Sequence, residues 1–163
     1  MKSPVPDLIH GLRCLSAILA KAETYCESHE IDPDALLTAR LFPDMFDLTR
    51  NVITACDAAK FTAARLSQTE PPRYDDSEAS FAELQARIAK TIAFLETVPD
   101  AAFATAETRE LAVPFAPAGT VPSGLTYLVR FAIPHFYFHL ATIYNILRHN
   151  GVPLAKRDFL WVN

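Results

Sequence analysis

Cysteine and glycine are scarce in this sequence of 163 residues, which contains 3 Cys and 4 Gly. The odd number of cysteines and the lack of a C-x-x-C spacing argue against a disulfide framework and favour reduced thiols in a cytoplasmic protein. Each cysteine lies in a helical apolar pattern, where a free thiol behaves as a small hydrophobic side chain. The chain also lacks a glycine-rich phosphate-binding loop.

Clusters of Lys and Arg are missing as well, and the net charge is −4 at pH 7 with an isoelectric point of about 5.7. A nucleic-acid-binding surface needs such a cluster, so we expect no nucleic-acid partner. No apolar run approaches the roughly 20 residues that span a membrane. Pro4, Asp7 and Arg13 interrupt what would have to be the apolar part of a signal peptide. We therefore expect no membrane partner, no export and a cytoplasmic location.

Apolar residues are abundant, at 50% of the sequence against 21% charged residues, and the mean hydropathy is +0.11. A single domain of this length, over residues 1–163, buries more than about 65% of the surface that its unfolded chain exposes. The apolar content is high for a domain of this kind. We take the surplus as an indication of a homodimer interface.

The apolar residues recur at alternating steps of three and four in four segments, which is typical of amphipathic helices. Ser80 and Glu83 form a capping box, Ser123 can cap a helix, and Gly151 has the place of a left-handed helix end. The sequence therefore predicts an all-α fold, a four-helix bundle. The expected helices cover about residues 5–28, 44–66, 81–98 and 123–150, with a short helical turn that begins at Pro33.

Two connections of this bundle are long. Residues 68–76 are expected to form a surface connection, because they contain Pro71 and Pro72. Residues 99–122, between the third and fourth helices, have no helical periodicity, and Glu110–Phe115 has the pattern of a short extended segment. This second connection either crosses the end of the bundle or covers a pocket.

A pair of histidines lies at helical spacing in the last helix. His135 and His139 are four residues apart, so both imidazoles lie on one helix face, where they can share a divalent metal. Phe136 replaces the glutamate of an H-E-x-x-H zinc-protease motif, and Pro134 predicts a kink or a restart of the helix. Since the pair borders the core, a metal, water or polar groups of another helix must satisfy both rings.

The remaining side chains of the last helix and two charged pairs also give expectations. Tyr127 and Arg130 are expected on an exposed helix face, with the mouth of a pocket as the alternative. Asp57 with Lys60, and Glu83 with Arg87, are expected to be solvated surface pairs that contribute little to stability. The continuous apolar row of the last helix is expected to be Val129, Ile133, Phe136, Leu140, Ile143 and Leu147.

Several segments of the chain are similar to one known group of bundles. The four amphipathic helices, the long third connection and the pattern His135-x3-His139-x7-Leu147-Arg148-x2-Gly151 resemble the DinB-like (DinB/YfiT) superfamily of bacterial proteins. A narrower resemblance is to an uncharacterised bacterial branch, known as a domain of unknown function. The segments that carry this narrower resemblance are Ala39–Phe46, Phe136–His139 and Leu147–Gly151.

The resemblance implies a divalent metal, for which we consider zinc, nickel and manganese, held by one His of the second helix and two of the fourth. Some members of the superfamily are thiol-dependent transferases, isomerases or dehalogenase-like enzymes. His135 and His139 match the pair of the fourth helix. The second helix here has no His, and the aligned position is Asn51, one turn after Asp47. Asp47 is the chemically better third ligand and Asn51 the better aligned one.

These features lead to three hypotheses and indicate neither a substrate nor a reaction. The first is a non-catalytic or binding homodimer, in which the His pair is a hydrogen-bonded structural feature. The alternative is a metal-dependent enzyme in which His135, His139 and an oxygen ligand hold an ion that activates water or a thiol. The third is a pocket for a small apolar ligand. Its lining would be the aromatic cluster Phe136, Tyr137, Phe138, Tyr144 and Trp161.

Overall fold

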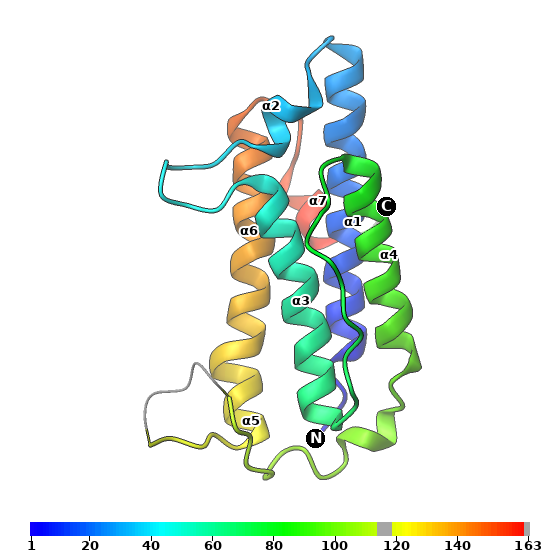
Figure 1. The fold of residues 1–163 in the computed structure, drawn as a ribbon, viewed down its shortest axis with the longest axis vertical. Coiled ribbons are helices and arrows are strands. Elements are labelled where there is room, and N and C mark those ends of the chain that lie inside the picture. The colour runs from blue at the N-terminus through cyan, green and yellow to red at the C-terminus, as the bar shows by residue number, and fades with distance from the viewer. Residues whose placement is uncertain (114–118, 162–163) are drawn as a thin grey trace.

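The computed structural model describes residues 1–113 and 119–161, and it confirms the all-α four-helix bundle (Figure 1). Within the described residues, β-structure is limited to one isolated bridge between Glu110 and Ser123. The long helices are α1 (Val5–Ser28), α3 (Leu48–Ser67), α4 (Phe81–Thr97) and a continuous rod of α5 (Gly124–Tyr127), the π-helical turn η2 (Leu128–Ala132) and α6 (Ile133–His149). The short helices are α2 (Pro33–Leu37), the 3-10 helix η1 (Asp100–Phe103) and α7 (Lys156–Leu160).

The helix directions explain why one connection is long. In Figure 1, α1 and α6 run upwards while α3 and α4 both run downwards, so α3 and α4 are parallel. The chain after α3 must therefore return along the whole bundle before α4 begins, and residues 68–80 do so as an extended crossover on the surface. The expected surface connection is confirmed, and its extended course follows from the parallel pair.

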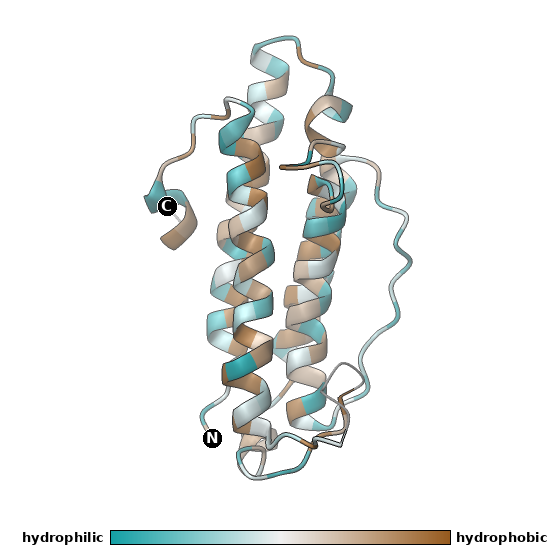
Figure 2. Cartoon of the chain, turned by 90° about the vertical axis from the view of Figure 1, so that its left-hand side faces the viewer, coloured by the Kyte–Doolittle hydropathy of each residue, from teal (hydrophilic) through white to brown (hydrophobic). Residues whose placement is uncertain are grey.

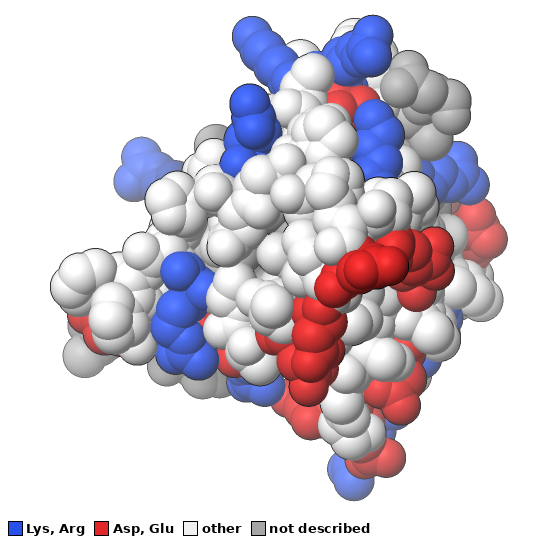
Figure 3. All heavy atoms as spheres, turned by 90° about the horizontal axis from the view of Figure 1, so that it is seen from above, with Lys and Arg blue, Asp and Glu red and all other residues white. Residues whose placement is uncertain are grey.

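The core lies between the four long helices, whose apolar stripes face inwards while polar residues face outwards (Figure 2). A small residue brings α1 close to α6, because a Cβ atom on Gly11 would lie 2.6 Å from the Phe136 ring. At the end where α1 stops, acidic side chains form a ridge, and basic side chains lie mainly along another edge (Figure 3). Charge is thus separated on this solvated end. None of the described helices is both long and apolar enough to cross a membrane.

The start of α3 differs from the expected start at Asp44. The helix begins at Leu48, and Asp47 is its N-cap, since its carboxylate accepts a hydrogen bond of 2.8 Å from the Arg50 backbone N–H. Arg40 holds the preceding loop out of helical conformation by donating to the Met45 carbonyl at 3.0 Å. The helix is therefore capped by Asp47, three residues after Asp44.

The rod that ends the bundle starts and stops as expected, with Ser123 as N-cap and Gly151 at φ +93°. Before Pro134, where the sequence predicts a kink or a restart, the helix continues and its hydrogen-bond pattern changes to the π-helical turn η2. Val129, expected in the apolar row, is 58% exposed. A π-helical turn takes more residues than an α-helical one, so it shifts the phase of the residues before Pro134. The row from Phe136 onwards is buried as expected.

The described parts of the connection between α4 and the rod, residues 98–113 and 119–123, cross the end of the bundle. Its backbone bonds to the start of the rod, through Gly124 N–H to the Arg109 carbonyl at 2.8 Å, and the Arg109 guanidinium donates to the Leu66 carbonyl at 2.8 Å. The predicted extended segment is reduced to the bridge at Glu110, while its residues 114–115 lie outside the described part of the chain. Of the two expected courses, the described parts of this connection follow the crossing.

The C-terminal segment packs on α1, where the Lys21 ammonium lies 2.8 Å from the buried Asp158 carboxylate and His10 Nε2 lies 2.8 Å from the Leu160 carbonyl.

All 3 cysteines are buried and free, as the sequence indicates. The expectation of solvated charge pairs is wrong for Lys60, which is 3% exposed and lies 2.8 Å from the Asp57 carboxylate. It is also wrong for Arg87, which is 0% exposed. Its guanidinium bonds to acidic residues of the crossover and of α3.

Candidate functional site

The two histidines of α6 and one amide of α3 form a buried polar cluster at the contact between these helices. His139 Nδ1 lies 2.8 Å from Asn51 Oδ1, and His139 Nε2 lies 3.1 Å from His135 Nε2. His139 is 5% exposed and Asn51 is 1% exposed. Helical spacing places both rings on one face, and the wide α3–α6 contact brings Asn51 to them. Polar groups of a neighbouring helix thus satisfy His139.

The partners of Asn51 determine the tautomers of both histidines. Asn51 Nδ2 donates to the Phe46 carbonyl at 3.0 Å and to the Asp47 carbonyl at 2.8 Å, which uses both of its protons. Asn51 Oδ1 is therefore an acceptor, so His139 Nδ1 must carry a proton and donate it to Oδ1. The lone pair of His139 Nε2 then faces His135, whose Nε2–H donates to it. This order leaves the lone pair of His135 Nδ1 as an acceptor.

Burial keeps both imidazoles neutral near pH 7. It lowers the pKa of His139 to about 4, and the nearby His135 ring adds to this effect because two adjacent positive charges repel. Burial also lowers the pKa of His135. Neutral imidazoles retain lone pairs, so the pair can accept hydrogen bonds or bind a cation.

Aromatic rings surround the pair. Phe46, from the loop before α3, stacks on His139 with ring centroids 6.5 Å apart and an interplanar angle of 15°, although it is itself exposed. Phe138 meets His139 edge-on at 5.2 Å, and Phe131 lies 5.0 Å from the His135 ring. The cluster therefore lies beneath a partly exposed aromatic surface.

The structure brings three of the four predicted metal-site residues together. Asp47 contributes only its backbone carbonyl, since its carboxylate caps α3 and pairs with Arg40 at 3.3 Å. Asn51 touches His139 on the nitrogen that faces away from His135. Among the described residues, no group of three or more His, Cys, Asp and Glu side chains could hold a metal ion.

The His pair itself has the spacing of two metal ligands. Two nitrogens bound at about 2.0–2.1 Å to a tetrahedral zinc lie roughly 3.3 Å apart, and the two Nε2 atoms here are 3.1 Å apart. The Nδ1–H of His139 donates to Asn51, as the outer nitrogen of a metal-binding imidazole normally donates to a fixed acceptor. The residues present thus fit two ligands and one supporting partner.

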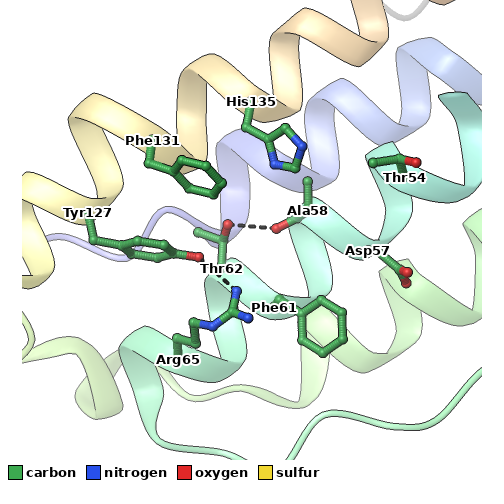
Figure 4. Close-up of a pocket in the computed structure, with 9 residues that line it drawn as sticks. All are labelled: Thr54, Asp57, Ala58, Phe61, Thr62, Arg65, Tyr127, Phe131 and His135. Atoms are coloured by element: carbon green, nitrogen blue, oxygen red, sulfur yellow. Dashed lines mark hydrogen bonds between the residues drawn. The ribbon is translucent and has the colours of Figure 1, made fainter. Parts of the chain in front are cut away.

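A cavity of about 230 Å³ opens beside His135, between α3 and the rod of α5, η2 and α6 (Figure 4). The His135 ring points towards it, and Arg65 donates to the Tyr127 hydroxyl at 3.3 Å at the opposite end. Its volume lies below the roughly 300–1,000 Å³ of sites for drug-sized ligands. The lining residues are Thr54, Asp57, Ala58, Phe61, Thr62, Arg65, Tyr127, Phe131 and His135.

The sequence placed few of these lining residues at a site. Tyr127 is 2% exposed and lines the cavity, so the expected exposed face is wrong for it and the alternative, a pocket, is what the structure shows, whereas Arg130 is exposed. Phe61 and Arg65 were not considered. Their spacing of four residues on α3, on the same side as Ala58, was the available signal, because a small residue leaves room beside it.

The predicted aromatic cluster does not surround one cavity. Phe136 is buried in the core, whereas Phe138 and Trp161 are exposed. Tyr144 packs edge-on against Phe159 of α7, beside a separate cavity of about 190 Å³. The aromatic side chains that line the cavity next to His135 come from α3 and from the first turns of the rod.

Comparisons with known proteins agree with this architecture. The family model described as "Domain of unknown function (DUF1993)" matches residues 2–160. A crystal structure of a DinB family member protein from Shewanella denitrificans is similar to this chain, with 42% sequence identity and a TM-score of 0.92. The match covers 98% of this chain and 90% of that one. No match was found among the curated proteins.

Proposed function

The chain belongs to the DUF1993 family and has the fold of a DinB family member, and from this premise we propose that it is a non-catalytic bundle that binds a small molecule. The binding site is the cavity between α3 and the rod. One observation carries the proposal: aromatic walls meet polar groups at both ends of this cavity, with His135 directed into it. Such a combination of apolar lining with a few convergent polar groups is typical of ligand sites.

Binding at this cavity can be measured through His135. We expect small aromatic or aliphatic molecules to shift the imidazole NMR signal of His135 in protein labelled at histidine. Ala58→Leu places a larger side chain in the cavity and should weaken binding by about tenfold or more. Ala82→Leu, on the exposed face of α4, is the matched control and should bind as the wild type does.

Two outcomes separate the possibilities for this site. A ligand that shifts His135 in the wild type and in Ala82→Leu, but not in folded Ala58→Leu, supports the cavity. A set of charged and neutral compounds that leaves the His135 signal unchanged contradicts the proposed function. The thermal midpoint of each variant establishes that it is folded before binding is compared.

A second candidate function is binding of a divalent ion by His135 and His139, and the 3.1 Å spacing of their Nε2 atoms favours it. When bound, such an ion polarises a carbonyl or lowers the pKa of water or a thiol. In this chain, His135 would have to carry its proton on Nδ1 instead of Nε2, and Asn51 would keep His139 oriented. Water or a bound small molecule would supply the remaining coordinating atoms.

Elemental analysis tests this candidate. After loading with zinc, nickel or manganese, we expect about one equivalent of metal per chain in the wild type and none in His135→Ala, because a single imidazole holds such an ion weakly. His149→Ala is the control, since His149 is exposed on the same helix. Equal metal contents in all three proteins, or no metal under any loading, would contradict a metal site at the His pair.

We propose further that the protein acts as a homodimer. Phe46 and Phe138 support this, because both are large exposed side chains whose rings lie beside the same His139 ring. Phe42 is a third exposed ring, in the loop that carries Phe46. Clustered exposed aromatics are typical of interfaces. Sedimentation of the wild type should give a dimer, and Phe42→Ser/Phe138→Ser should shift it towards monomer. A wild type that sediments as a monomer at high concentration would contradict this proposal.

A further inference from the structure

The end of the cavity opposite His135 offers hydrogen-bond donors. Arg65 Nη1 donates to the Tyr127 hydroxyl at 3.3 Å, so the Tyr127 oxygen acts there as an acceptor. The hydroxyl proton of Tyr127 has no acceptor among the described residues, although the side chain is 2% exposed. A buried hydroxyl normally finds a partner. This end of the cavity therefore presents a cation and an unused donor to whatever enters.

The middle of the cavity is flat and apolar. The Phe131 ring stacks on the Tyr127 ring at 5.9 Å with an interplanar angle of 23°. Phe61 lies on the α3 side, with the Arg65 guanidinium carbon 5.1 Å from its centroid. Figure 4 shows both phenylalanine rings bordering the space between His135 and Arg65. Rings in this position favour a planar or otherwise compact apolar body.

The end near His135 offers acceptors. Thr54 donates to the Arg50 carbonyl at 2.7 Å, so its hydroxyl oxygen keeps a lone pair for a donor. Thr62 lies nearer the Tyr127 hydroxyl (Figure 4). His135 Nδ1 is an acceptor through the order of protons described above. Asp57 lines the cavity on the side away from Arg65 (Figure 4), and it is paired with Lys60 at 2.8 Å and Arg87 at 3.0 Å.

We propose that the ligand of this cavity is a small carboxylic acid whose apolar body carries a hydrogen-bond donor at its far end. The carboxylate accepts from Arg65 and from the Tyr127 hydroxyl, which are the donors that a carboxylate requires. The far donor meets His135 Nδ1 and the Thr54 oxygen, and Asp57 disfavours the reverse orientation. This ligand class rests on the proposed function, because it assumes that the cavity binds small molecules.

Three probe compounds test the carboxylate preference separately from binding in the cavity. 4-Hydroxybenzoate has both polar ends, benzoate lacks the far donor, and 4-hydroxybenzamide replaces the carboxylate with a neutral group of similar shape. Calorimetry should show 4-hydroxybenzoate binding about tenfold or more tightly than 4-hydroxybenzamide, the factor that corresponds to one charge-assisted hydrogen bond. Benzoate should bind more weakly than 4-hydroxybenzoate and should shift His135 less.

Variants test whether Arg65 and Tyr127 cause the preference for the carboxylate. Arg65→Met should abolish the difference between 4-hydroxybenzoate and 4-hydroxybenzamide, and Tyr127→Phe should reduce it. Arg13→Met is the control, since Arg13 is an exposed arginine of α1, and it should keep the wild-type ratio. Each variant is compared at the same pH, with its thermal midpoint recorded.

Each result bears on one of two claims, that the cavity binds small molecules or that its ligand is a carboxylate. A carboxylate preference that disappears in folded Arg65→Met and persists in Arg13→Met supports the inference. If 4-hydroxybenzamide binds as tightly as 4-hydroxybenzoate and shifts His135, the cavity binds ligands but the carboxylate class is wrong. If none of the three probes binds at millimolar concentration, the inferred ligand class is overturned, while the broader compound set remains the test of the cavity.

Discussion

Replacement of Arg87 by Ala is expected to lower the free energy of unfolding by about 3–5 kcal/mol, because removing one partner of a buried ion network leaves the others uncompensated. Arg87 is 0% exposed. Its Nη1 donates to both carboxylate oxygens of Glu78, at 3.0 and 3.1 Å, and Nη2 to Asp57 at 3.0 Å and Asp76 at 3.1 Å. Glu78 is itself largely buried, so it would lose its main partner.

The same side chain attaches the crossover to the bundle. Arg87 Nη1 also donates to the Asp75 carbonyl at 3.1 Å, and its guanidinium lies 5.4 Å from the Tyr74 ring. Residues 70–79 are outside any helix, so side-chain contacts such as these hold them in place. We therefore expect Arg87→Ala to increase hydrogen exchange in residues 68–80 more than in α1, in addition to the lower stability in guanidinium unfolding.

An exposed ion pair provides the matched control. Arg13 and Glu96 lie 3.5 Å apart, and their side chains are 57% and 54% exposed. Arg13→Ala should change the unfolding free energy by only about 0–1 kcal/mol, since water screens exposed pairs. If Arg87→Ala proved no more destabilising than Arg13→Ala, the buried network would contribute little, and the crossover would have to be held by its other contacts.

Arg87 also shows why some of the structure could not be predicted from the sequence. Along the helix, Glu83 is the acidic neighbour one turn away, and this spacing suggested an ordinary surface pair. Its actual partners come from the crossover and from α3, and their position depends on α3 and α4 being parallel. Local spacing contains no information about that direction. The helices themselves were predictable, because periodicity and caps such as Ser80 act within a few residues.

The candidate site likewise contains some features that the sequence predicts and others that it does not. The shared face of His135 and His139 follows from helical geometry, and the contact of His139 with Asn51 agrees with the alignment implied by the family resemblance. The place of Tyr127 did not follow, because η2 changes the rotation of the rod before Pro134. Arg65 of α3 bonds to Tyr127 of the rod, so its contact also depends on how η2 rotates the start of the rod.

The second prediction with a large effect is a loss of stability in mild acid. We expect the wild type to lose about 2 kcal/mol of unfolding free energy between pH 7 and pH 5 through His139. Its folded pKa is about 4, whereas an unfolded histidine has a pKa of about 6.5. The unfolded state therefore binds more protons than the folded state between these values. Stability is fully present above pH 6.5 and falls as the pH decreases towards 4.

The hydrogen-bond order explains why His139 resists protonation. A proton added to its Nε2 would face the Nε2–H that His135 donates, so two donors would meet at 3.1 Å. His135, whose pKa burial also lowers, contributes in the same direction. The carboxylates with lowered pKa values are Asp76, Glu83 and Asp158, and they contribute stability that is lost only as the pH falls below their ordinary pKa of about 4. Their window is thus separate from the one between pH 7 and pH 5.

His139→Gln is the test, with urea unfolding at pH 7 and pH 5 as the measurement. The variant should be less stable than the wild type at pH 7, because it loses ring packing, but its stability should change by less than about 1 kcal/mol between the two pH values. His149→Gln, at an exposed position of the same helix, should keep the wild-type dependence on pH. If His139→Gln kept that dependence, other groups would cause the acid sensitivity, and His139 would not be held neutral by its surroundings.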